Sequence, residues 1–410
     1  MKKIDKIRVQ LSFDKENILD VGEIVTQNQK FYFKYHTALK KYQLQLSPFK
    51  LPLTDSIVDM SSFPFDGMAG VFNDSLPDGW GRLLLDRMLT TKGININDIT
   101  LLDRLAYVGS FGAGALVYQP ELGEEEEYSN IRLDELFHQS EKVLEGTSEE
   151  VIDELFDLGG SSGGARPKVN VIHNPITNTL SSGNKLKEND EHWIIKFPSS
   201  FDANDIANIE YAYYKMALDC GIEMSECKLF YGASGKAYFG TKRFDRIGQN
   251  QRLHMHSASG IMHDNFRLSN MDYGHLLDCA FQLERDVAAY NRVFRLACFN
   301  VFTHNRDDHS KNFAFLMNKD GQWKFAPAYD LTYSTSSHGF HSTMVAGESQ
   351  HPTSKDLLKL AAHFNIQEAE NIIDEVKSVV EKWSNYADKY SVSSGSKNKI
   401  QKSIIKLIDS

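Results

Sequence analysis

The chain has 410 residues, which is long enough for two or three domains with a substantial buried core. Hydrophobic residues make up 41% and charged residues 24%, an ordinary globular composition. The net charge of −10 excludes a protein that binds nucleic acid through its overall charge and leaves only a local basic face for such a role. No apolar run reaches the length of a membrane span, so we expect no membrane partner. The four cysteines form no CxxC pair, which favours reduced thiols and a cytoplasmic protein.

The N-terminal region is predicted to be rich in β-strands. Apolar residues alternate in KIRVQLSF (6–13), KFYFKYH (30–36) and YQLQLSPF (42–49), which is typical of an antiparallel sheet. This pattern also favours a strand over a signal peptide at the N-terminus. A helix is expected in GWGRLLLDRMLTTKG (79–93), closing on its last glycine. The acidic run GEEEEYSN (123–130) is expected to be a solvated linker.

Helices and strands are mixed in the rest of the chain. Amphipathic helices are predicted at 131–146, 149–158, 206–220 and 371–383, a longer buried helix at 287–304, strands at 191–200 and 237–246, and a hairpin at 313–331 with its turn at 319–321. The order lacks strict βαβ alternation. It therefore predicts an α+β fold, with a sheet-rich N-terminal region before a larger, mostly helical C-terminal lobe.

The segment HNRDDHSKNF (304–313) carries the strongest chemical signal. It places many polar residues between two apolar runs, and buried charge is tolerated only when it is paired or bound to a metal. Asp307 stands five residues before Asn312, the spacing of the protein-kinase catalytic loop. There the aspartate accepts the proton of a substrate hydroxyl and the asparagine holds Mg²⁺.

Other residues along the chain fit the same chemistry. Asp330 follows the predicted hairpin and would supply a second oxygen ligand to Mg²⁺. Lys196 lies on an apolar strand, either as a strand-edge residue with its ammonium in water or as a ligand of ATP phosphates. The turn GGSSGGARPK precedes it, and Gly163 and Gly164 would let backbone N–H groups approach a phosphate closely.

Five motifs in this order resemble the HipA family of serine/threonine kinases, the toxins of bacterial toxin–antitoxin pairs. The similarity covers nearly the whole chain. The motifs are FNDSLPDGWGRLLLDRML with LLDRLAYVGSFGAGALVY for the N-terminal region, SSGGARPK for the phosphate loop, IIKFP for the ATP-lysine strand, NRDDHSKNF for the catalytic loop and PAYDL for the metal aspartate.

The resemblance implies a role for each matching residue. Asp307 would be the catalytic base, Asn312 and Asp330 would bind Mg²⁺, and Lys196 would bind the ATP phosphates. The expected division is an N-terminal β-rich subdomain at 1–122, an ATP-binding part of the kinase core with the glycine-rich loop at 131–260, and a helical lobe with the catalytic loop and metal site at 261–410.

Further candidate residues surround this set. Ser161 would be the autophosphorylated serine, but the second serine, Ser162, leaves open which of the two is modified. Both serines and the glycines after them would cover the nucleotide. Lys242 and Phe244 fall where the family contacts adenine. Lys311 is a candidate for stabilising the transferring phosphoryl group. His309 is expected to hydrogen-bond within the loop and is kept as a candidate cofactor contact.

The resemblance also implies cofactors and partners. ATP and Mg²⁺ would be required, and the protein substrate would belong to translation, with an aminoacyl-tRNA synthetase as the family's typical target. A helix-turn-helix antitoxin would bind the chain, so that DNA would be contacted only through the antitoxin.

Two alternative functions differ in chemistry. One is a nucleotide-binding interaction module without catalysis, which the presence of Asp307, Asn312 and Asp330 disfavours. The other is a metal phosphohydrolase built on His304, Asp307, Asp308 and His309. Such an enzyme needs distant histidine partners, for which the sequence offers no evident cluster.

Overall fold

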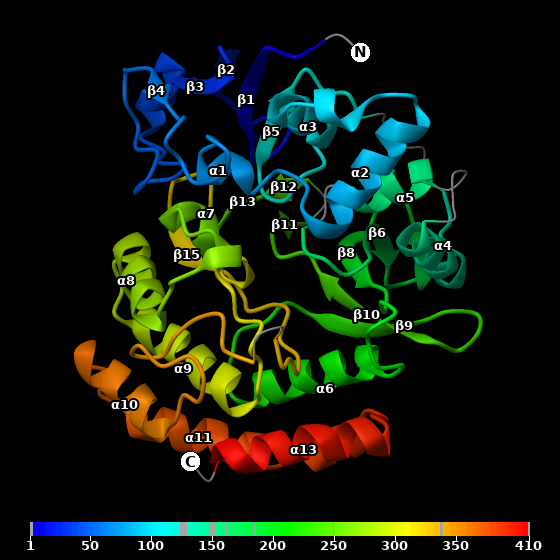
Figure 1. Cartoon of the computed structure of the whole chain (residues 1–410), viewed down its shortest axis with the longest axis vertical. Coiled ribbons are helices and arrows are strands. Elements are labelled where there is room, and N and C mark those ends of the chain that lie inside the picture. The colour runs from blue at the N-terminus through cyan, green and yellow to red at the C-terminus, as the bar shows by residue number, and fades with distance from the viewer. Residues whose placement is uncertain are drawn as a thin grey trace. The chain divides into compact units, whose positions relative to one another are not determined.

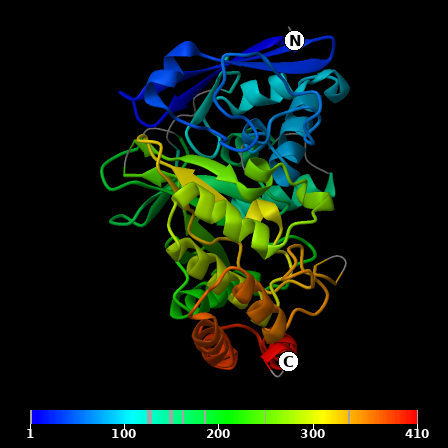
Figure 2. The same cartoon turned by 90° about the vertical axis from the view of Figure 1, so that its left-hand side faces the viewer.

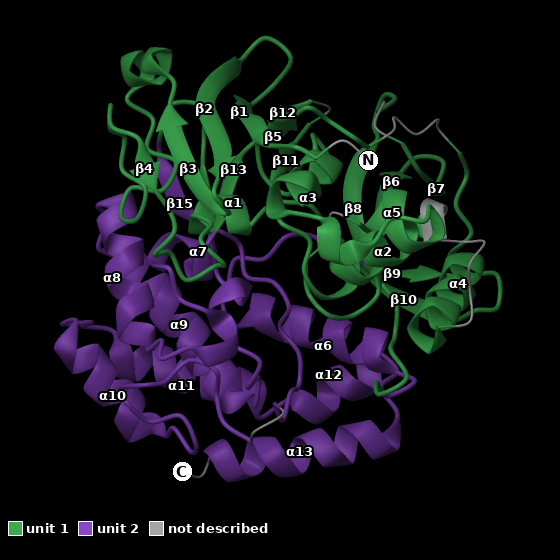
Figure 3. Cartoon of the chain, turned by 45° about the horizontal axis from the view of Figure 1, so that its top comes forward, with its two compact units in different colours: residues 1–202, 230–256, 316–321 green, residues 203–229, 257–315, 322–410 purple. Residues whose placement is uncertain are grey.

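The computed structural model describes residues 3–123, 129–146, 152–160, 163–183, 186–248, 250–336 and 339–408 (Figure 1). The chain forms two compact units, coloured separately in Figure 3. Unit 1 comprises residues 1–202, 230–256 and 316–321, and unit 2 comprises residues 203–229, 257–315 and 322–410. The predicted linker at 123–130 lies mostly outside the described residues, and the expected three-part division of the chain stays a prediction.

The N-terminal sheet confirms two of the three predicted N-terminal strands. Its order is β4-β3-β2-β1-β5, and its first strands are blue in Figures 1 and 2. Ile7, Val9 and Leu11 alternate along β1 and are fully buried, because successive side chains of a strand point to opposite faces. The strands are β1 (Lys6–Ser12), β2 (Ile18–Gln27), β3 (Lys30–Tyr35), β4 (Val58–Asp59) and β5 (Leu116–Gln119).

The predicted strand at 42–49 is wrong. Residues Thr37–Tyr42 form a 3-10 helix, and Gln43 after it adopts a left-handed backbone with φ of +52°. Only a single bridge between Ser47 and Leu51 follows. Leu44 and Leu46 are buried, so the alternation indicated which side chains face the core but not strand pairing.

A second five-stranded sheet in the order β7-β6-β8-β10-β9 carries the predicted ATP lysine. One face, with Val171, Trp193 and Ile195, packs into a core with Trp80 of α2 and Leu136 of α4. The strands are β6 (Lys168–Asn174), β7 (Thr179–Ser181), β8 (Glu191–Lys196), β9 (Cys227–Tyr231) and β10 (Ala237–Lys242), and a small hairpin joins β11 (Arg246–Ile247) to β12 (Gln251–Arg252). The helices of unit 1 are α1 (Gly70–Asn73), α2 (Gly79–Thr91), α3 (Leu101–Val108), α4 (Leu133–Glu145) and α5 (Ile152–Gly159).

Unit 2 is mostly helical, and the predicted long buried helix, α9, contributes the largest share of its core. Its helices are α6 (Ile206–Asp219), α7 (Ala258–Met262), α8 (Tyr273–Glu284), α9 (Ala288–Phe302), α10 (Ser354–His363), α11 (Ala369–Val380), α12 (Trp383–Lys389) and α13 (Ser394–Ile408). A further sheet, not all of whose residues belong to unit 2, has the order β13-β14-β15 and comprises His254–Ser257, Ala314–Met317 and Trp323–Phe325; its hairpin turns at Gly321, as predicted. These elements confirm the α+β fold class.

Two further sequence expectations can be compared with the structure. Cys220, Cys227, Cys279 and Cys298 are all buried free thiols, as predicted. Among the described helices, none combines the length and the hydropathy that crossing a bilayer requires.

Candidate active site

The loop between α9 and β14 carries the predicted catalytic residues, and it lies within unit 2. After α9 ends at Phe302, His304 adopts a left-handed backbone with φ of +58° and turns the chain out of the helix. A 3-10 turn at Ser310–Asn312 then leads into β14, whose four residues are all buried. The apolar frame seen in the sequence thus anchors both ends of the polar loop.

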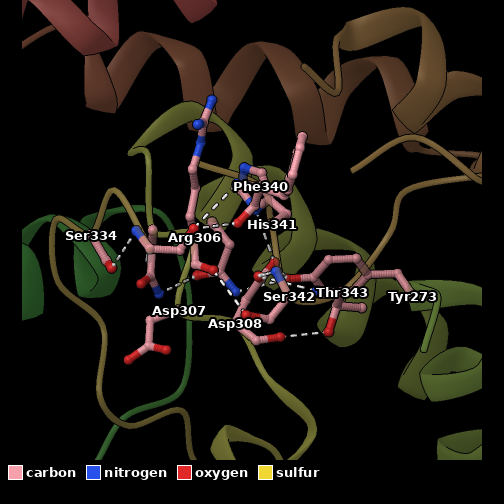
Figure 4. A network of polar contacts seen from close by, with 12 residues as sticks. Tyr273, Arg306, Asp307, Asp308, Ser334, Phe340, His341, Ser342 and Thr343 are labelled. Carbon is pink, nitrogen blue, oxygen red and sulfur yellow. Dashed lines mark hydrogen bonds and ion pairs between the residues drawn. The ribbon is translucent and has the colours of Figure 1, made fainter. Parts of the chain in front are cut away.

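Asp308 fastens the middle of this loop to the protein (Figure 4). Its side chain is fully buried and accepts hydrogen bonds from the Tyr273 hydroxyl at 2.9 Å and from His341 Nδ1 at 3.0 Å. The backbone N–H groups of Ser342 and Thr343 donate to the other carboxylate oxygen at 2.8 and 3.3 Å. Four donors around one buried carboxylate satisfy its lone pairs and fix its position.

A second layer holds Tyr273 in place. The Asn300 amide donates to the Tyr273 hydroxyl at 2.9 Å, and the Asn305 amide donates to Asn300 Oδ1 at 2.9 Å. Burial and the charge of Asp308 raise the pKa of Tyr273 well above its ordinary value. The hydroxyl therefore stays protonated and donates a hydrogen bond to Asp308.

Asp307, one residue earlier, has the opposite environment. Its side chain is 59% exposed and points away from the Asp308 network in Figure 4. The Asn312 side-chain N–H donates to the Asp307 carbonyl at 2.7 Å, which closes the D-x-x-x-x-N segment into a turn. The loop therefore presents one aspartate and buries its neighbour.

The segment after β15 lies beside this turn. The Tyr329 hydroxyl donates to the Lys311 carbonyl at 2.6 Å, which brings the residue before Asp330 next to the residue before Asn312. Asp330 has a φ of +55°, a backbone conformation that is uncommon outside glycine and that clusters at functional sites. Because the amide nitrogen of Asn312 is already bonded, its oxygen remains as an acceptor. Asn312 and Asp330 thus offer the oxygen ligands that suit Mg²⁺.

Phe266 lies beneath the other two candidate residues of the loop. Its ring centroid is 5.2 Å from that of His309, and the Lys311 ammonium is 5.0 Å from the Phe266 centroid. His309 Nε2 is 3.9 Å from a carboxylate oxygen of Asp307, and Nδ1 has no hydrogen-bond partner among the described residues. The His309 carbonyl accepts a hydrogen bond from the Asn312 N–H at 2.8 Å, so His309 does hydrogen-bond within the loop, while its ring packs against Phe266.

Lys196 ends β8 in unit 1. It pairs with Lys168 of β6 and with Phe239 of β10, and its ammonium is 5.4 Å from the Phe239 ring centroid. This face of the sheet is opposite to the one that carries Trp193 and Ile195, because residues two apart on a strand share a face. Lys196 therefore lies outside the apolar core of the sheet.

The glycine-rich turn is docked onto the start of α2 in the same unit. The Gly164 N–H donates to Asp78 at 2.5 Å, and the Trp80 N–H donates to the Gly164 carbonyl at 2.9 Å. Gly164 has a φ of +87°, and a Cβ on Gly79 would lie 2.4 Å from the Gly164 carbonyl oxygen. Both glycines are thus required by the docking itself, a packing role that the sequence did not suggest.

Basic residues near the turn are already engaged. The Lys168 ammonium donates to the Gly163 carbonyl at 2.5 Å, and Arg166 forms an ion pair with Asp202 at 2.8 Å. Ser161 and Ser162 lie outside the described residues, so their predicted modification stays a prediction.

The predicted adenine contacts follow β10. The Lys242 ammonium donates to Glu191 at 2.5 Å, and Phe244 is half-buried. Whether either residue contacts a nucleotide stays a prediction.

The phosphohydrolase alternative is not supported, because Asp308 is not available to bind a metal ion. Asp308 is fully used by its four donors, and within the described part of the chain no three His, Cys, Asp or Glu side chains are grouped to hold a metal ion.

The sequence did not predict that four further residues support the site: Tyr273, Tyr329, His341 and Asp78. The only signal was the doubled aspartate at 307 and 308, because two adjacent carboxylates in a short loop rarely share one environment. The partners themselves lie too far away in the sequence to be inferred from spacing.

Comparisons with known proteins agree with this fold and loop. Residues 17–119 match the HipA N-terminal domain, and residues 160–383, more than half of the chain, match the HipA-like C-terminal domain. The chain therefore belongs to the HipA family.

Individual relatives are distant. The serine/threonine-protein kinase toxin HipA of Shewanella oneidensis is 24% identical over 283 residues, covering 62% of this chain and 60% of that protein. A Haemophilus influenzae protein whose name contains the word kinase is 27% identical over 169 residues, covering 38% of this chain and 49% of that protein. The chain thus spans about half to three-fifths of these curated relatives. A chain from the complex of Shewanella oneidensis HipA, HipB and operator DNA shares the fold, with a TM-score of 0.71, 16% identity and 98% coverage of both chains.

Proposed function

We propose that this chain is an ATP- and Mg²⁺-dependent serine/threonine protein kinase of the HipA type. Its family membership supports this, and the observation that carries it is the contrast between exposed Asp307 and anchored Asp308 in a loop closed by Asn312. A catalytic base must reach solvent and substrate, and it must be held by groups that do not move.

The chain's own residues would divide the work as follows. Asp307 would accept the proton of the substrate hydroxyl while the hydroxyl oxygen attacks the terminal phosphorus of ATP and ADP departs with the electrons of the broken P–O bond. Asp308 and its four donors keep the Asp307 backbone still, and Lys311, half-buried against Phe266, offers a positive charge near the same loop. Lys196 contacts the phosphates from β8, and the docked glycine turn covers them.

Mg²⁺ held by Asn312 and Asp330 would neutralise charge on the phosphate oxygens during transfer. The proposal assigns groups of both units to one reaction. It therefore requires that substitutions in either unit reduce the same activity.

The direct test is transfer of labelled phosphate from ATP to proteins of a lysate of the source cell. The wild-type chain with Mg²⁺ should label specific proteins on serine or threonine, and the Asp307→Ala variant should label none. Equal labelling by both chains would refute the assignment.

Autophosphorylation of Ser161 or Ser162 is a second part of the proposal. A phosphoserine carries about −1.5 to −2 charges near pH 7 and could not share a pocket with the terminal phosphate of ATP. Modification should therefore switch the enzyme off. Mass spectrometry after incubation with Mg-ATP should find the phosphate on one of these serines in the wild-type chain and not in Asp307→Ala.

We also propose a protein substrate in translation, with an aminoacyl-tRNA synthetase as the first candidate, and a helix-turn-helix antitoxin as partner. The support is the family and a relative of the same fold in complex with HipB and operator DNA. Buried free thiols support a cytoplasmic setting. Co-purification of a small DNA-binding protein with the tagged chain from the source cell would test the partnership.

A further inference from the structure

A pocket of about 240 Å³ lies within unit 1, and neither Lys196 nor Gly163 and Gly164 line it. Two of its lining residues, Arg243 and Arg246, flank the predicted adenine contact Phe244. Its lining includes Arg243, Arg246 and Arg252, together with Asn170, His192 and Tyr107. Three guanidinium groups around one cavity are unusual, because desolvated positive charge must be balanced by a partner.

One carboxylate balances two of these arginines. Asp245 is buried and bonds to Arg243 at 2.7 Å and to Arg246 at 2.6 Å, and both arginine side chains are only 8% exposed. Although burial alone raises the pKa of Asp245, the charges of Arg243 and Arg246 lower it below its ordinary value, so it is ionised. The carbonyls of Gly112 and Gly114 accept further N–H groups of the two arginines.

Arg252 forms no ion pair with a carboxylate among the described residues, although the charges of Asp245 and Glu121 act on it. Its guanidinium donates to the Ser110 carbonyl at 2.9 Å, and it makes no other side-chain hydrogen bond within the part of the chain that the structure describes. Moreover, Arg252 is paired directly opposite Arg246 on the β11–β12 hairpin. Like charges directly opposite each other on antiparallel strands destabilise the pair, and of these two arginines only Arg246 has an ion pair among the described residues.

The remaining wall mixes apolar and polar side chains and includes Lys15, Asp14 and Asp157. Burial and the charge of Arg243 lower the pKa of His192 to about 3, so its imidazole is uncharged at neutral pH. It offers one donor and one acceptor to the cavity. Asp14 and Asp157 also line the pocket, but Asp14 already accepts hydrogen bonds from Asn17 and Asp157 is likewise engaged.

We propose that this pocket is a binding site for a small phosphate-bearing anion, with Arg252 as its principal ligand. The guanidinium fork suits two phosphate oxygens, and Arg243 and Arg246 add a positive charge beside it that Asp245 balances only in part. Lys196, the proposed ATP contact, does not line this pocket and ends β8 four residues beyond His192, which does.

The experiment is titration of the full chain with inorganic phosphate at constant ionic strength, followed by calorimetry and by the thermal unfolding midpoint. The wild-type chain should bind phosphate and unfold at a higher midpoint. Arg252→Gln should bind at least about tenfold more weakly, because a charged hydrogen bond is lost. Arg132→Gln removes an arginine with a side chain that is 78% exposed and should bind like the wild type.

Two more variants keep the test decisive. Lys196→Ala should retain phosphate binding. If this variant did not bind phosphate, the anion would lie at the proposed nucleotide site and the proposal would be overturned. His192→Phe fills the cavity without changing charge and should also weaken binding, which covers the case in which Arg252→Gln does not fold.

Two further results would overturn the proposal. One is equal binding by the wild type and Arg252→Gln. Another is tighter binding of malonate than of phosphate at the same ionic strength, since the pocket would then be a carboxylate site.

Discussion

Asp307 and Asp308 are adjacent in the sequence but are expected to have separable roles. The side chain of Asp307 is largely exposed and that of Asp308 is buried among four donors. A substitution of Asp307 should therefore reduce phosphoryl transfer alone. A substitution of Asp308 should reduce both phosphoryl transfer and the free energy of unfolding.

For Asp307→Ala we expect loss of phosphoryl transfer by roughly 10²–10⁴-fold, because a positioned base is removed. ATP binding and the unfolding free energy should stay near wild type, since the side chain is exposed. Single-turnover assays with calorimetric ATP titration measure both. Near wild-type transfer would contradict the role of Asp307.

For Asp308→Ala we expect a loss of about 2–4 kcal/mol in the free energy of unfolding. The buried donors of Tyr273 and His341 would lose their acceptor, and water does not reach them. Urea denaturation of this variant beside Asp307→Ala provides the comparison. Equal stability of the two variants would show that the network does not anchor the loop.

Substitutions of the proposed metal ligands and of Lys196 should have different effects on ATP binding. Asp330→Ala and Asn312→Ala should weaken ATP binding only when Mg²⁺ is present, while Lys196→Ala should weaken it with or without the metal. Calorimetric titration of ATP with and without Mg²⁺ distinguishes the two patterns. If Asp330→Ala binds Mg-ATP like the wild type, Asp330 is not a metal ligand.

At the scale of elements, the docking of the glycine turn on α2 is the most specific contact. Gly79→Ala introduces a Cβ 2.4 Å from the backbone oxygen of Gly164, and that oxygen cannot move without breaking its bond to the Trp80 N–H. We expect this variant to lose stability and to bind ATP more weakly, because the turn over the proposed phosphate site is displaced.

Gly93→Ala is the matched control. Gly93 has a φ of +72° but no atom within 4 Å of the added Cβ, so only the left-handed backbone is penalised, by about 1 kcal/mol. The free energy of unfolding should fall by at least about 1 kcal/mol more in Gly79→Ala than in Gly93→Ala, because Gly79→Ala adds a steric clash. Equal losses in urea denaturation would show that the docking contact contributes nothing.

Elements that are specified by neighbouring residues in the sequence could be predicted. The helix at 79–91, the strand ending at Lys196 and the hairpin after the loop were expected, because periodicity and turn residues specify them within a few positions. The strand at 42–49 was wrong, because the alternation marked buried leucines without showing that a partner strand was absent there.

The site was predictable in part for the same reason. The spacing of Asp307 and Asn312 lies within one turn and is visible in the sequence. The hydrogen bonds of Asp308 to Tyr273 and His341 join positions 33 to 35 residues apart, and that of Gly164 to Asp78 spans 86 residues. No local pattern encodes these pairs, because only the folded backbone brings them together.

For the whole molecule, two buried histidines predict a pH dependence of stability. Burial lowers the pKa of His192 and of His254 to about 3, below the ordinary value of about 6.5. Between these values the unfolded chain binds protons that the native imidazoles do not. The free energy of unfolding should therefore fall as the pH decreases from about 6.5 towards 3, by up to about 1.4 kcal/mol per pH unit for each histidine.

Above pH 6.5 the two histidines should no longer contribute to the slope. His254→Gln should reduce the acid slope, while His138→Gln, which changes an exposed histidine, should leave it unchanged. Thermal unfolding between pH 4.5 and 7.5 measures these slopes. An acid slope that is identical in wild type and His254→Gln would contradict the assignment.

The anchoring of Asp308 also has a consequence during synthesis on the ribosome. The partners that fix the catalytic loop include residues 341–343, which are made about 35 residues after the loop itself. A nascent chain that already contains Asp307, Asn312 and Asp330 therefore still lacks the groups that hold Asp308. We expect that an incomplete chain released before residue 341 would be inert, so a cell would meet the activity of this protein only from chains translated past that point.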